Sequence, residues 1–180
     1  MKTDIIILAA GNSTRFESNK LFATLHGKPL LEHVLIACQK HHCIVVGKKE
    51  VQGLANRYQM QFVENQQSEL GISHSIQLGI KHSNADRYLF VLGDQPFIQE
   101  TTIDKMVSDP ADQILCATYR HEWYSPVAFP MRYQEALLSL KGDRGGKSIC
   151  HLHPDDVKEI EVGQLEVIDI DDQNTLQLFI

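Results

Sequence analysis

The chain has 180 residues, of which 43% are hydrophobic and 22% are charged, and its formal net charge at pH 7 is −6. This composition is typical of a globular protein rather than a disordered one, and the length suits one domain, which we expect to span residues 1–180. Because a general nucleic-acid binder needs a concentrated positive face, the acidic balance argues against nucleic acid as a partner.

The sequence also argues against a membrane protein and against a secreted one. Its apolar runs are far shorter than the roughly 20 residues that a membrane span needs. The N-terminal residues lead directly into Ile5-Ile6-Ile7-Leu8, which is typical of a buried strand rather than of a signal peptide. The four cysteines form no C-x-x-C pair, and free thiols are usual in a reducing compartment. We therefore expect a cytoplasmic protein.

Short apolar runs alternate with segments of helical periodicity along the chain, which favours an α/β fold with a mostly parallel sheet. Strands are predicted at residues 4–8, 43–46, 61–63, 87–92, 114–117, 127–129, 157–162 and 167–170. Helices are predicted at residues 100–107, 133–140 and 146–152, and two more begin at Pro29 and near Gly71. The pattern indicates a Rossmann-like, three-layer sandwich.

A loop of small residues follows the first predicted strand and is accompanied by two cations, Arg15 and Lys20. Open α/β sheets bind ligands at the carboxyl ends of their strands, where backbone N–H groups can face phosphate oxygens. Arg15 offers a planar fork for phosphate, and Lys20 adds a compact point charge. G-x-G-x-x-G and the P-loop pattern are both absent. The loop predicts a triphosphate cradle, with a plain βα loop as the alternative.

A carboxylate stands directly after the predicted strand at 87–92, in Gly93-Asp94-Gln95-Pro96. Mg²⁺ commonly binds one or two carboxylates together with substrate phosphates. If this strand neighbours the first one, Asp94 lies at the same edge of the sheet as the phosphate loop, and Pro96 presents it rigidly. The alternative is an Asp that only forms a turn or caps the next helix.

The string from Leu8 to Lys20 resembles the signature L-A-[AG]-G-x-S-x-R-[MF]-G-x-x-K of the MobA-like nucleotidyltransferases, and most closely that of the molybdenum cofactor cytidylyltransferases. Gly-Asp-Gln-Pro at 93–96 is similar to the motif that the same branch of the family carries after this strand. The resemblance implies a fold of the nucleotide-diphospho-sugar transferase type. It also implies that Arg15 and Lys20 stabilise charge at the α-phosphate and that Asp94 coordinates the catalytic Mg²⁺. Glu17 departs from the pattern, which has Gly there.

Asn65 and residues 70–79 resemble the family segment G-x-x-x-S-[LIV]-x-x-G, which helps to hold the base and ribose. The resemblance implies that Gly71 and Ser75 contact the nucleotide, with helix capping as the alternative. The nucleotide-binding residues that we predict from both segments are Leu8, Ala9, Ala10, Gly11, Asn12, Ser13, Gly71 and Ser75.

Residues 142–147 resemble the family element G-D-x-G-[AG]-[RK] on the acceptor side. The resemblance implies that Asp143, Arg144 and Lys147 face the acceptor, with a solvated loop as the alternative. Residues 167–171 are similar to the closing element of the family, which implies that Asp169 lies near the metal unless it is structural.

These motifs predict an in-line transfer in which an acceptor phosphate attacks the α-phosphorus of a nucleoside triphosphate and pyrophosphate leaves, with Mg²⁺ as cofactor. In the family, A-A-G at the first loop accompanies CTP and A-G-G accompanies GTP. Because this chain has Ala9-Ala10-Gly11, the resemblance implies CTP, a molybdopterin-type acceptor and a molybdenum enzyme as partner.

Three alternatives remain open. A guanylyltransferase that uses GTP is disfavoured by Ala10, and a methylerythritol-phosphate cytidylyltransferase by the acidic end of the chain. A non-catalytic chaperone that binds or inserts molybdenum cofactor is favoured by Glu17 but opposed by the presence of Arg15, Lys20 and Asp94.

Overall fold

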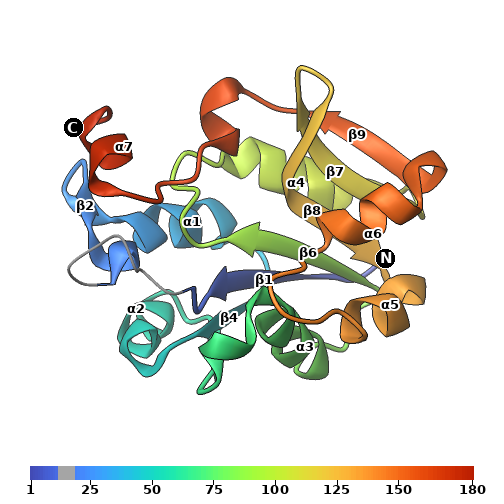
Figure 1. Ribbon diagram of the computed structural model, residues 1–180, viewed down its shortest axis with the longest axis horizontal. Coiled ribbons are helices and arrows are strands. Elements are labelled where there is room, and N and C mark those ends of the chain that lie inside the picture. The colour runs from blue at the N-terminus through green and yellow to red at the C-terminus, as the bar shows by residue number, and fades with distance from the viewer. Residues whose placement is uncertain (12–18) are drawn as a thin grey trace.

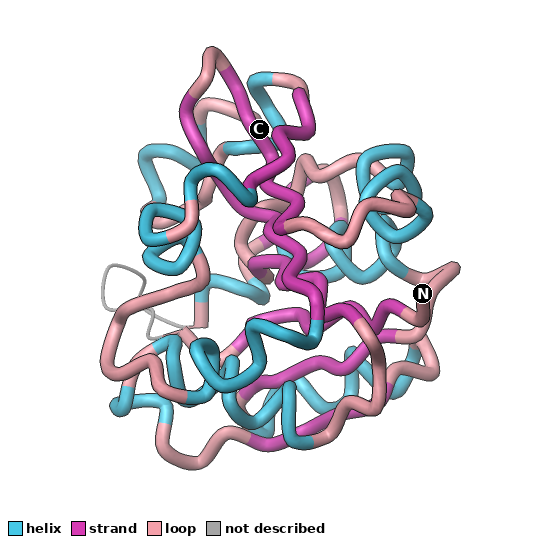
Figure 2. The backbone as a smooth tube through the Cα atoms, turned by 90° about the vertical axis from the view of Figure 1, so that its right-hand side faces the viewer, coloured by secondary structure: helices cyan, strands magenta, loops and turns pink. Residues whose placement is uncertain are grey.

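The computed structural model of the chain describes residues 1–11 and 19–180. A seven-stranded sheet with the order β5-β4-β1-β6-β8-β7-β9 forms its centre, and Figure 2 shows this sheet twisting between helices on both sides. The strands are β1 (Thr3–Ala9), β4 (Cys43–Gly47), β5 (Gln61–Glu64), β6 (Arg87–Leu92), β7 (Ile114–Tyr119), β8 (Glu122–Pro130) and β9 (Val157–Glu161). Only β8 runs against the others in this described sheet, between β6 and β7. The predicted mostly parallel α/β fold is confirmed.

The two strands that precede the predicted motifs are neighbours. β1 pairs in parallel with β6 over its length, and Leu8 lies opposite Leu92 at the end of the ladder. The backbone N–H of Gly93 extends this ladder by donating to the Leu8 carbonyl oxygen at 3.0 Å. Because the two strands end together, the loop after β1 and the carboxylate after β6 lie at one edge of the sheet.

Helices cover both faces of the sheet and bury the side chains that alternate along each strand. One face carries α1 (Leu30–Cys38), α2 (Gln52–Arg57) and α4 (Glu100–Ser108), and the other carries α3 (Ile72–Lys81), α5 (Gln134–Leu138) and α6 (Lys147–Leu152). In β1, Ile5 and Ile7 face the first group, whereas Ile6 and Leu8 face the second. No helix in the described part of the chain has the length and apolar character that crossing a membrane requires.

The last residues fold back to the other end of the sequence. The short helix α7 (Gln173–Gln177) lies beside the small hairpin of β2 (Thr24–Leu25) and β3 (Lys28–Pro29), as Figure 1 shows in red and blue. Leu176 and Ile170 share a separate small core with Leu25 and Leu30. This packing carries the acidic segment 169–172 across the carboxyl edge of β6.

The strand predicted at 167–170 is wrong. A 3-10 turn occupies Gln164–Val167, and the residues after it form an irregular strap. Instead of joining a ladder, the N–H of Ile170 donates to the backbone oxygen of Asp94 at 3.0 Å. The alternation of apolar residues that suggested a strand arises because Ile170 packs into the small core with α7.

Two other elements differ from the prediction. α2 was not predicted, because in its six residues only Leu54 and Ala55 are buried. The strand predicted at 127–129 is part of the longer β8, which forms a hairpin with β7. Arg120 and His121 make the turn of this hairpin with positive φ angles of 51° and 65°, which is typical of the turns that join twisted antiparallel strands.

Candidate active site

A cavity of about 430 Å³ opens at the edge where β1 and β6 end. Its lining includes every predicted nucleotide-binding residue that the structure describes, together with Lys20 and Asp94. Those lining residues are Leu8, Ala9, Ala10, Gly11, Gly71 and Ser75. The predicted residues Asn12, Ser13 and Arg15, and the departure at Glu17, lie outside the described residues. Two motifs that are far apart in sequence therefore share one cavity.

Lys20 begins a 3-10 turn (Lys20–Phe22) at the mouth of this cavity. The side chain of Asn19 caps the turn by accepting the N–H of Leu21 at 3.1 Å. The Lys20 ammonium donates to Asp94 Oδ2 and to Asp171 Oδ1, both at 2.7 Å. Burial alone would lower the pKa of Lys20, but the two carboxylates outweigh burial and raise it. Lys20 is therefore a charged bridge between two acids.

Asp94 is held close to the sheet by the residue before it. A side chain at Gly93 would bring a Cβ within 3.2 Å of the Leu8 oxygen and of Leu31 Cδ1, so glycine lets the turn pass close to β1. The Asp94 side chain is 19% exposed. The Asp94 carboxylate is thus fixed at the cavity, and both its backbone and its side chain are bonded across the edge of the sheet.

A third carboxylate, Asp169, lies close to this pair. Protein atoms crowd it and withdraw it partly from water, and the negative charges of Asp94 and Asp171 act in the same direction, so that its pKa is raised to about 6. A hydrogen bond from Gln95 offsets part of this shift. Among the described residues of this edge, three carboxylates thus lie near the Lys20 ammonium.

This set of groups is suited to a divalent cation that shares its ligands with a substrate. Carboxylate oxygens are ligands for hard cations such as Mg²⁺, which keeps several waters or phosphate oxygens in its shell. Within residues 1–11 and 19–180, no three His, Cys, Asp or Glu side chains converge into a ready-made metal cage. The carboxylates of Asp94, Asp169 and Asp171 thus fit an open metal site that a substrate phosphate completes.

The far wall of the cavity is formed by a close contact between two backbones. Gly71 has a φ of +86° and a ψ of −179° at the start of α3, a conformation that is almost confined to glycine. A Cβ there would lie 2.4 Å from the Gly142 carbonyl and 2.7 Å from an Asp143 oxygen. The N–H of Ser73 donates to the Gly142 oxygen at 3.1 Å. The nucleotide side and the predicted acceptor loop therefore touch directly.

A second cavity of about 220 Å³ adjoins the first and shares Leu8, Ile72, Leu92 and Asp143 with it. Its remaining walls are largely apolar and include side chains of β6, β8 and α3. Of the predicted acceptor residues, Asp143 and Lys147 line this cavity, whereas Arg144 is exposed and lines neither cavity. The Lys147 ammonium contacts the Trp123 carbonyl oxygen at 3.4 Å and lies 5.7 Å from the centre of the Tyr124 ring.

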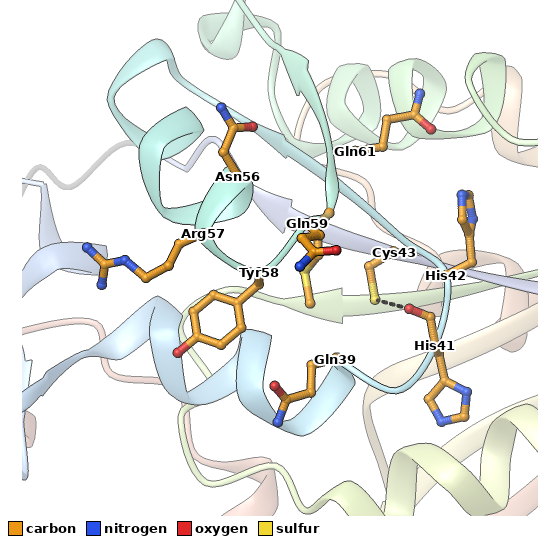
Figure 3. A pocket seen from close by; sticks show the side chains of 10 residues that line it. Gln39, His41, His42, Cys43, Asn56, Arg57, Tyr58, Gln59 and Gln61 are labelled. Carbon is orange, nitrogen blue, oxygen red and sulfur yellow. Dashed lines mark hydrogen bonds between the residues drawn. The ribbon is translucent and has the colours of Figure 1, made fainter.

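A larger hollow, of about 940 Å³, lies at the opposite edge of the sheet, near the amino ends of β4 and β5. Figure 3 shows its lining side chains, with the Cys43 thiol directed to the backbone oxygen of His41. His41 and His42 are bonded to Asp104 and Asp4, at 2.6 and 2.9 Å. These groups are engaged in structural pairs, so we place the candidate site at the carboxyl edge.

Two residues of this edge were not among the predicted site residues, although both belong to segments that resemble the family. Asp171 pairs with Lys20 across 151 positions, and no local pattern links residues so far apart. Asn65 is buried behind the cavity and bonds to Ser75. Asn65 directly follows β5. A polar residue just beyond a strand is the same signal that identified Asp94.

Known proteins resemble the chain in sequence and in fold. The bifunctional protein GlmU of Hydrogenovibrio crunogenus is 35% identical over 117 residues, which are 60% of this chain and 26% of that protein. The chain thus spans about a quarter of the length of the curated relatives it matches. A nucleotidyl transferase from Methanothermobacter superposes with a TM-score of 0.85 at 18% identity, over 99% of this chain and 96% of the other.

Two further solved structures carry ligands. Rv0371c of Mycobacterium tuberculosis in complex with manganese has a TM-score of 0.79 at 20% identity, over 99% of this chain and 98% of that one. CMP:2-keto-3-deoxy-manno-octonic acid synthetase complexed with CTP has a TM-score of 0.76 at 14% identity, over 99% and 96%. At these identities the superpositions establish the shared fold.

The family model that matches is that of the MobA-like NTP transferase domain, and it covers residues 5–157. This span contains most of β1, all of β6 and the walls of both cavities. It ends before the strap that brings Asp169 and Asp171 to the site. Because the match covers most of the sequence and includes Lys20 and Asp94, the chain belongs to the MobA-like nucleotidyltransferases.

Proposed function

We propose that this protein transfers CMP from CTP to a phosphorylated acceptor of the molybdopterin type and releases pyrophosphate, with Mg²⁺ as its cofactor. The observation that carries the proposal is the Lys20 ammonium held between Asp94 and Asp171, 2.7 Å from each, at the mouth of the cavity after β1. In this reaction a negatively charged phosphate and a positively charged metal ion must bind side by side. A cationic side chain next to acidic side chains suits that requirement.

In the proposed reaction, an oxygen of the acceptor phosphate attacks the α-phosphorus of CTP in line. The bond between that phosphorus and the bridging oxygen breaks, and the electron pair leaves with pyrophosphate. Such a transfer depends mainly on positioning and on charge stabilisation. The acceptor phosphate is already ionised near neutral pH, so no strong general base is required.

The residues of the chain supply this positioning. Ala10 and Gly11 let the triphosphate approach the backbone, since they carry little or no side chain. Lys20 offsets the charge on the α-phosphate and on the leaving pyrophosphate, and by resemblance Arg15 does the same. Asp94, with Asp169 or Asp171, would hold the Mg²⁺. When bound, this metal neutralises phosphate oxygens and makes the α-phosphorus more electrophilic.

CTP is supported by the small residue at the middle of the first loop. Ala10 is 4% exposed and lines the cavity, and Ala-Ala-Gly is the form that accompanies CTP in the resembling family. A protein of the same fold has been solved with CTP. Ser75 also lines the cavity and offers a hydroxyl to the base.

The acceptor is proposed from the second cavity. Its walls are largely apolar, with Phe90, Val127 and Phe129 among them, and a flat heterocycle such as a pterin suits such a surface. Lys147 and Asp143 line the same cavity, so a positive charge is available for the acceptor phosphate. The shared wall at Leu8 and Leu92 brings the acceptor next to the nucleotide.

The experiment that tests the proposal measures pyrophosphate release with CTP, GTP, ATP or UTP, with Mg²⁺, in the presence and absence of molybdopterin. We expect release with CTP only when molybdopterin is present, and its loss in Asp94→Asn. The exposed Asp155, which belongs to a distant 3-10 turn, provides the matched control Asp155→Asn, which should keep wild-type activity.

Other results would change the proposal in defined ways. Release with GTP would show that the interpretation of Ala10 is wrong and would favour the guanylyltransferase. Release with CTP and methylerythritol phosphate would identify another acceptor. CTP binding without release for any acceptor would favour a protein that binds cofactor without catalysis.

A further inference from the structure

Asn65 lies just behind the nucleotide cavity and is 2% exposed. Its own N–H donates to the Gly47 oxygen at 2.8 Å. Its side-chain Oδ1 accepts the backbone N–H of Gln67 at 2.9 Å, and its Nδ2 donates to Ser75 Oγ at 2.9 Å. Because a backbone N–H can only donate, the oxygen of the Asn65 amide must face Gln67, and its NH₂ group must face Ser75.

This fixed amide determines how the Ser75 hydroxyl can act. Ser75 is 4% exposed and lines the nucleotide cavity. Its oxygen accepts a hydrogen from Asn65, so its own hydrogen remains to be donated. A serine in a helix often donates to the carbonyl four residues earlier, but no bond of this kind is formed to Gly71, whose oxygen accepts the N–H of His74. Within the described part of the chain, no acceptor takes the Ser75 hydrogen.

We propose that Asn65 is a positioning residue that makes Ser75 a hydrogen-bond donor toward the nucleobase. The chain of hydrogen bonds runs in one direction, from Gln67 N–H to Asn65, from Asn65 to Ser75, and from Ser75 into the cavity. The base must therefore present an acceptor at this point, which in cytosine is O2 or N3. The inference rests on the proposed nucleotide role of the cavity, and it adds the reason why one edge of the base is selected.

The proposal predicts that a near-isosteric change will reverse the direction of the bond. In Asn65→Asp, both side-chain oxygens are acceptors, so one can keep the Gln67 N–H while the other takes the Ser75 hydrogen. Ser75 would then show only lone pairs to the cavity, and these would repel the acceptor of the base. We expect CTP affinity to fall about tenfold, the size of one lost hydrogen bond together with one unfavourable contact.

The test is a double-mutant cycle measured by titration calorimetry with CTP and Mg²⁺ on the full chain. Ser75→Ala and Asn65→Asp should each weaken CTP binding about tenfold, and the double variant should be no weaker than Asn65→Asp alone. Asn56→Asp makes the same chemical change on an exposed residue at the opposite edge of the sheet, and it should bind CTP like the wild type. Thermal unfolding verifies that each variant is folded.

If Asn65→Asp does not fold, Asn65→Ala replaces it in the cycle. This change removes the donor without adding a charge, and we expect about a threefold loss that disappears in the Ser75→Ala background. Independent, additive losses from Asn65 and Ser75, or wild-type affinity in Asn65→Asp, would overturn the proposal. Wild-type protein that binds GTP instead of CTP would contradict the proposed nucleotide only, since the cycle can be run with GTP.

Discussion

The ammonium of Lys20 lies 2.7 Å from a carboxylate oxygen of Asp94, although the two residues are 74 positions apart. The same nitrogen is 2.7 Å from Asp171, so one lysine occupies the point at which two acids converge. In the proposed function, Lys20 would therefore compete with a divalent cation for these carboxylates and would also be a partner for phosphate. We expect that a metal bound with its triphosphate would make this lysine exchange carboxylates for phosphate oxygens.

Replacing Lys20 by methionine should separate these two roles. We expect Lys20→Met to lower nucleotidyl transfer at least a hundredfold, since a preorganised cation at the phosphate is lost. Without nucleotide, the same variant should bind Mn²⁺ more tightly than the wild type, because the carboxylates lose their internal counter-charge. Electron paramagnetic resonance of free Mn²⁺ measures this binding. Lys81→Met, at an exposed position at the end of α3, is the control, and equal Mn²⁺ affinity in both variants would contradict the competition.

The contact between Gly71 and Gly142 should not tolerate a methyl group. We expect Gly71→Ala to destabilise the fold by about 1–3 kcal/mol, because it forces alanine into a glycine conformation, and to weaken CTP binding by displacing the wall. Gly53→Ala is the matched control, since a Cβ at this helical position meets no atom within 4 Å. Chemical denaturation and CTP titration on both variants measure the difference. A Gly71→Ala protein as stable as Gly53→Ala would refute this account of the wall.

Two basic residues of the segment 142–147 should differ in their effect on the acceptor. Lys147 lines the apolar cavity, whereas Arg144 lines neither cavity. We expect Lys147→Met to raise the KM for the acceptor severalfold with little change in the KM for CTP, and Arg144→Met to leave both values near those of the wild type. Steady-state kinetics with each substrate varied in turn provides the measurement. A larger effect at Arg144 would restore its predicted place at the acceptor.

Asp109 should make stability depend on pH. Burial alone would raise its pKa, but hydrogen bonds from Lys158 and from the N–H of Ala111, at 2.7 and 2.9 Å, together with the nearby charge of Arg87, outweigh burial and lower the pKa. A lowered pKa stabilises the fold above the unfolded value of about 3.9, and this stabilisation is lost as the pH falls through the folded value.

We therefore expect Asp109→Asn to cost about 2 kcal/mol in free energy of unfolding at pH 7. The gap between the variant and the wild type should shrink below about pH 4. Urea denaturation at several pH values provides the measurement, with the exposed Asp155→Asn as control. A gap that stays constant down to pH 3 would show that the charge of Asp109 is not responsible.

Much of the fold could be predicted from local patterns. The run Ile5-Ile6-Ile7-Leu8 is buried on both faces, as apolar runs of central parallel strands are, and the predicted helices at α1, α3 and α4 follow their apolar spacing. The convergence of the first loop with Asp94 could also be expected, because parallel neighbours end at one edge. These features depend on residues that are close in sequence or on a simple rule of topology.

The features of the fold and of the site that could not be predicted depend on contacts between residues that are distant in sequence. Nothing near Lys20 indicates that Asp171 would reach it, and the strap around Ile170 was mistaken for a strand because it is apolar where it meets the small core of α7. The role of Asn65 depends on the direction of hydrogen bonds, which no pattern of residue types encodes. Arg144 has the right charge at the right spacing, yet lines neither cavity.

The pairing of Lys20 with Asp171 across 151 positions affects the order in which the protein matures. A ribosome makes Lys20 and Asp94 before it makes the strap, and domains generally fold from the N-terminus as they emerge. Until residue 171 has left the exit tunnel, Lys20 lacks the Asp171 carboxylate. The Asp171 carboxylate thus joins Lys20 and Asp94 only after every strand of the sheet has been made, so a nascent chain can form its sheet before this acidic edge is complete.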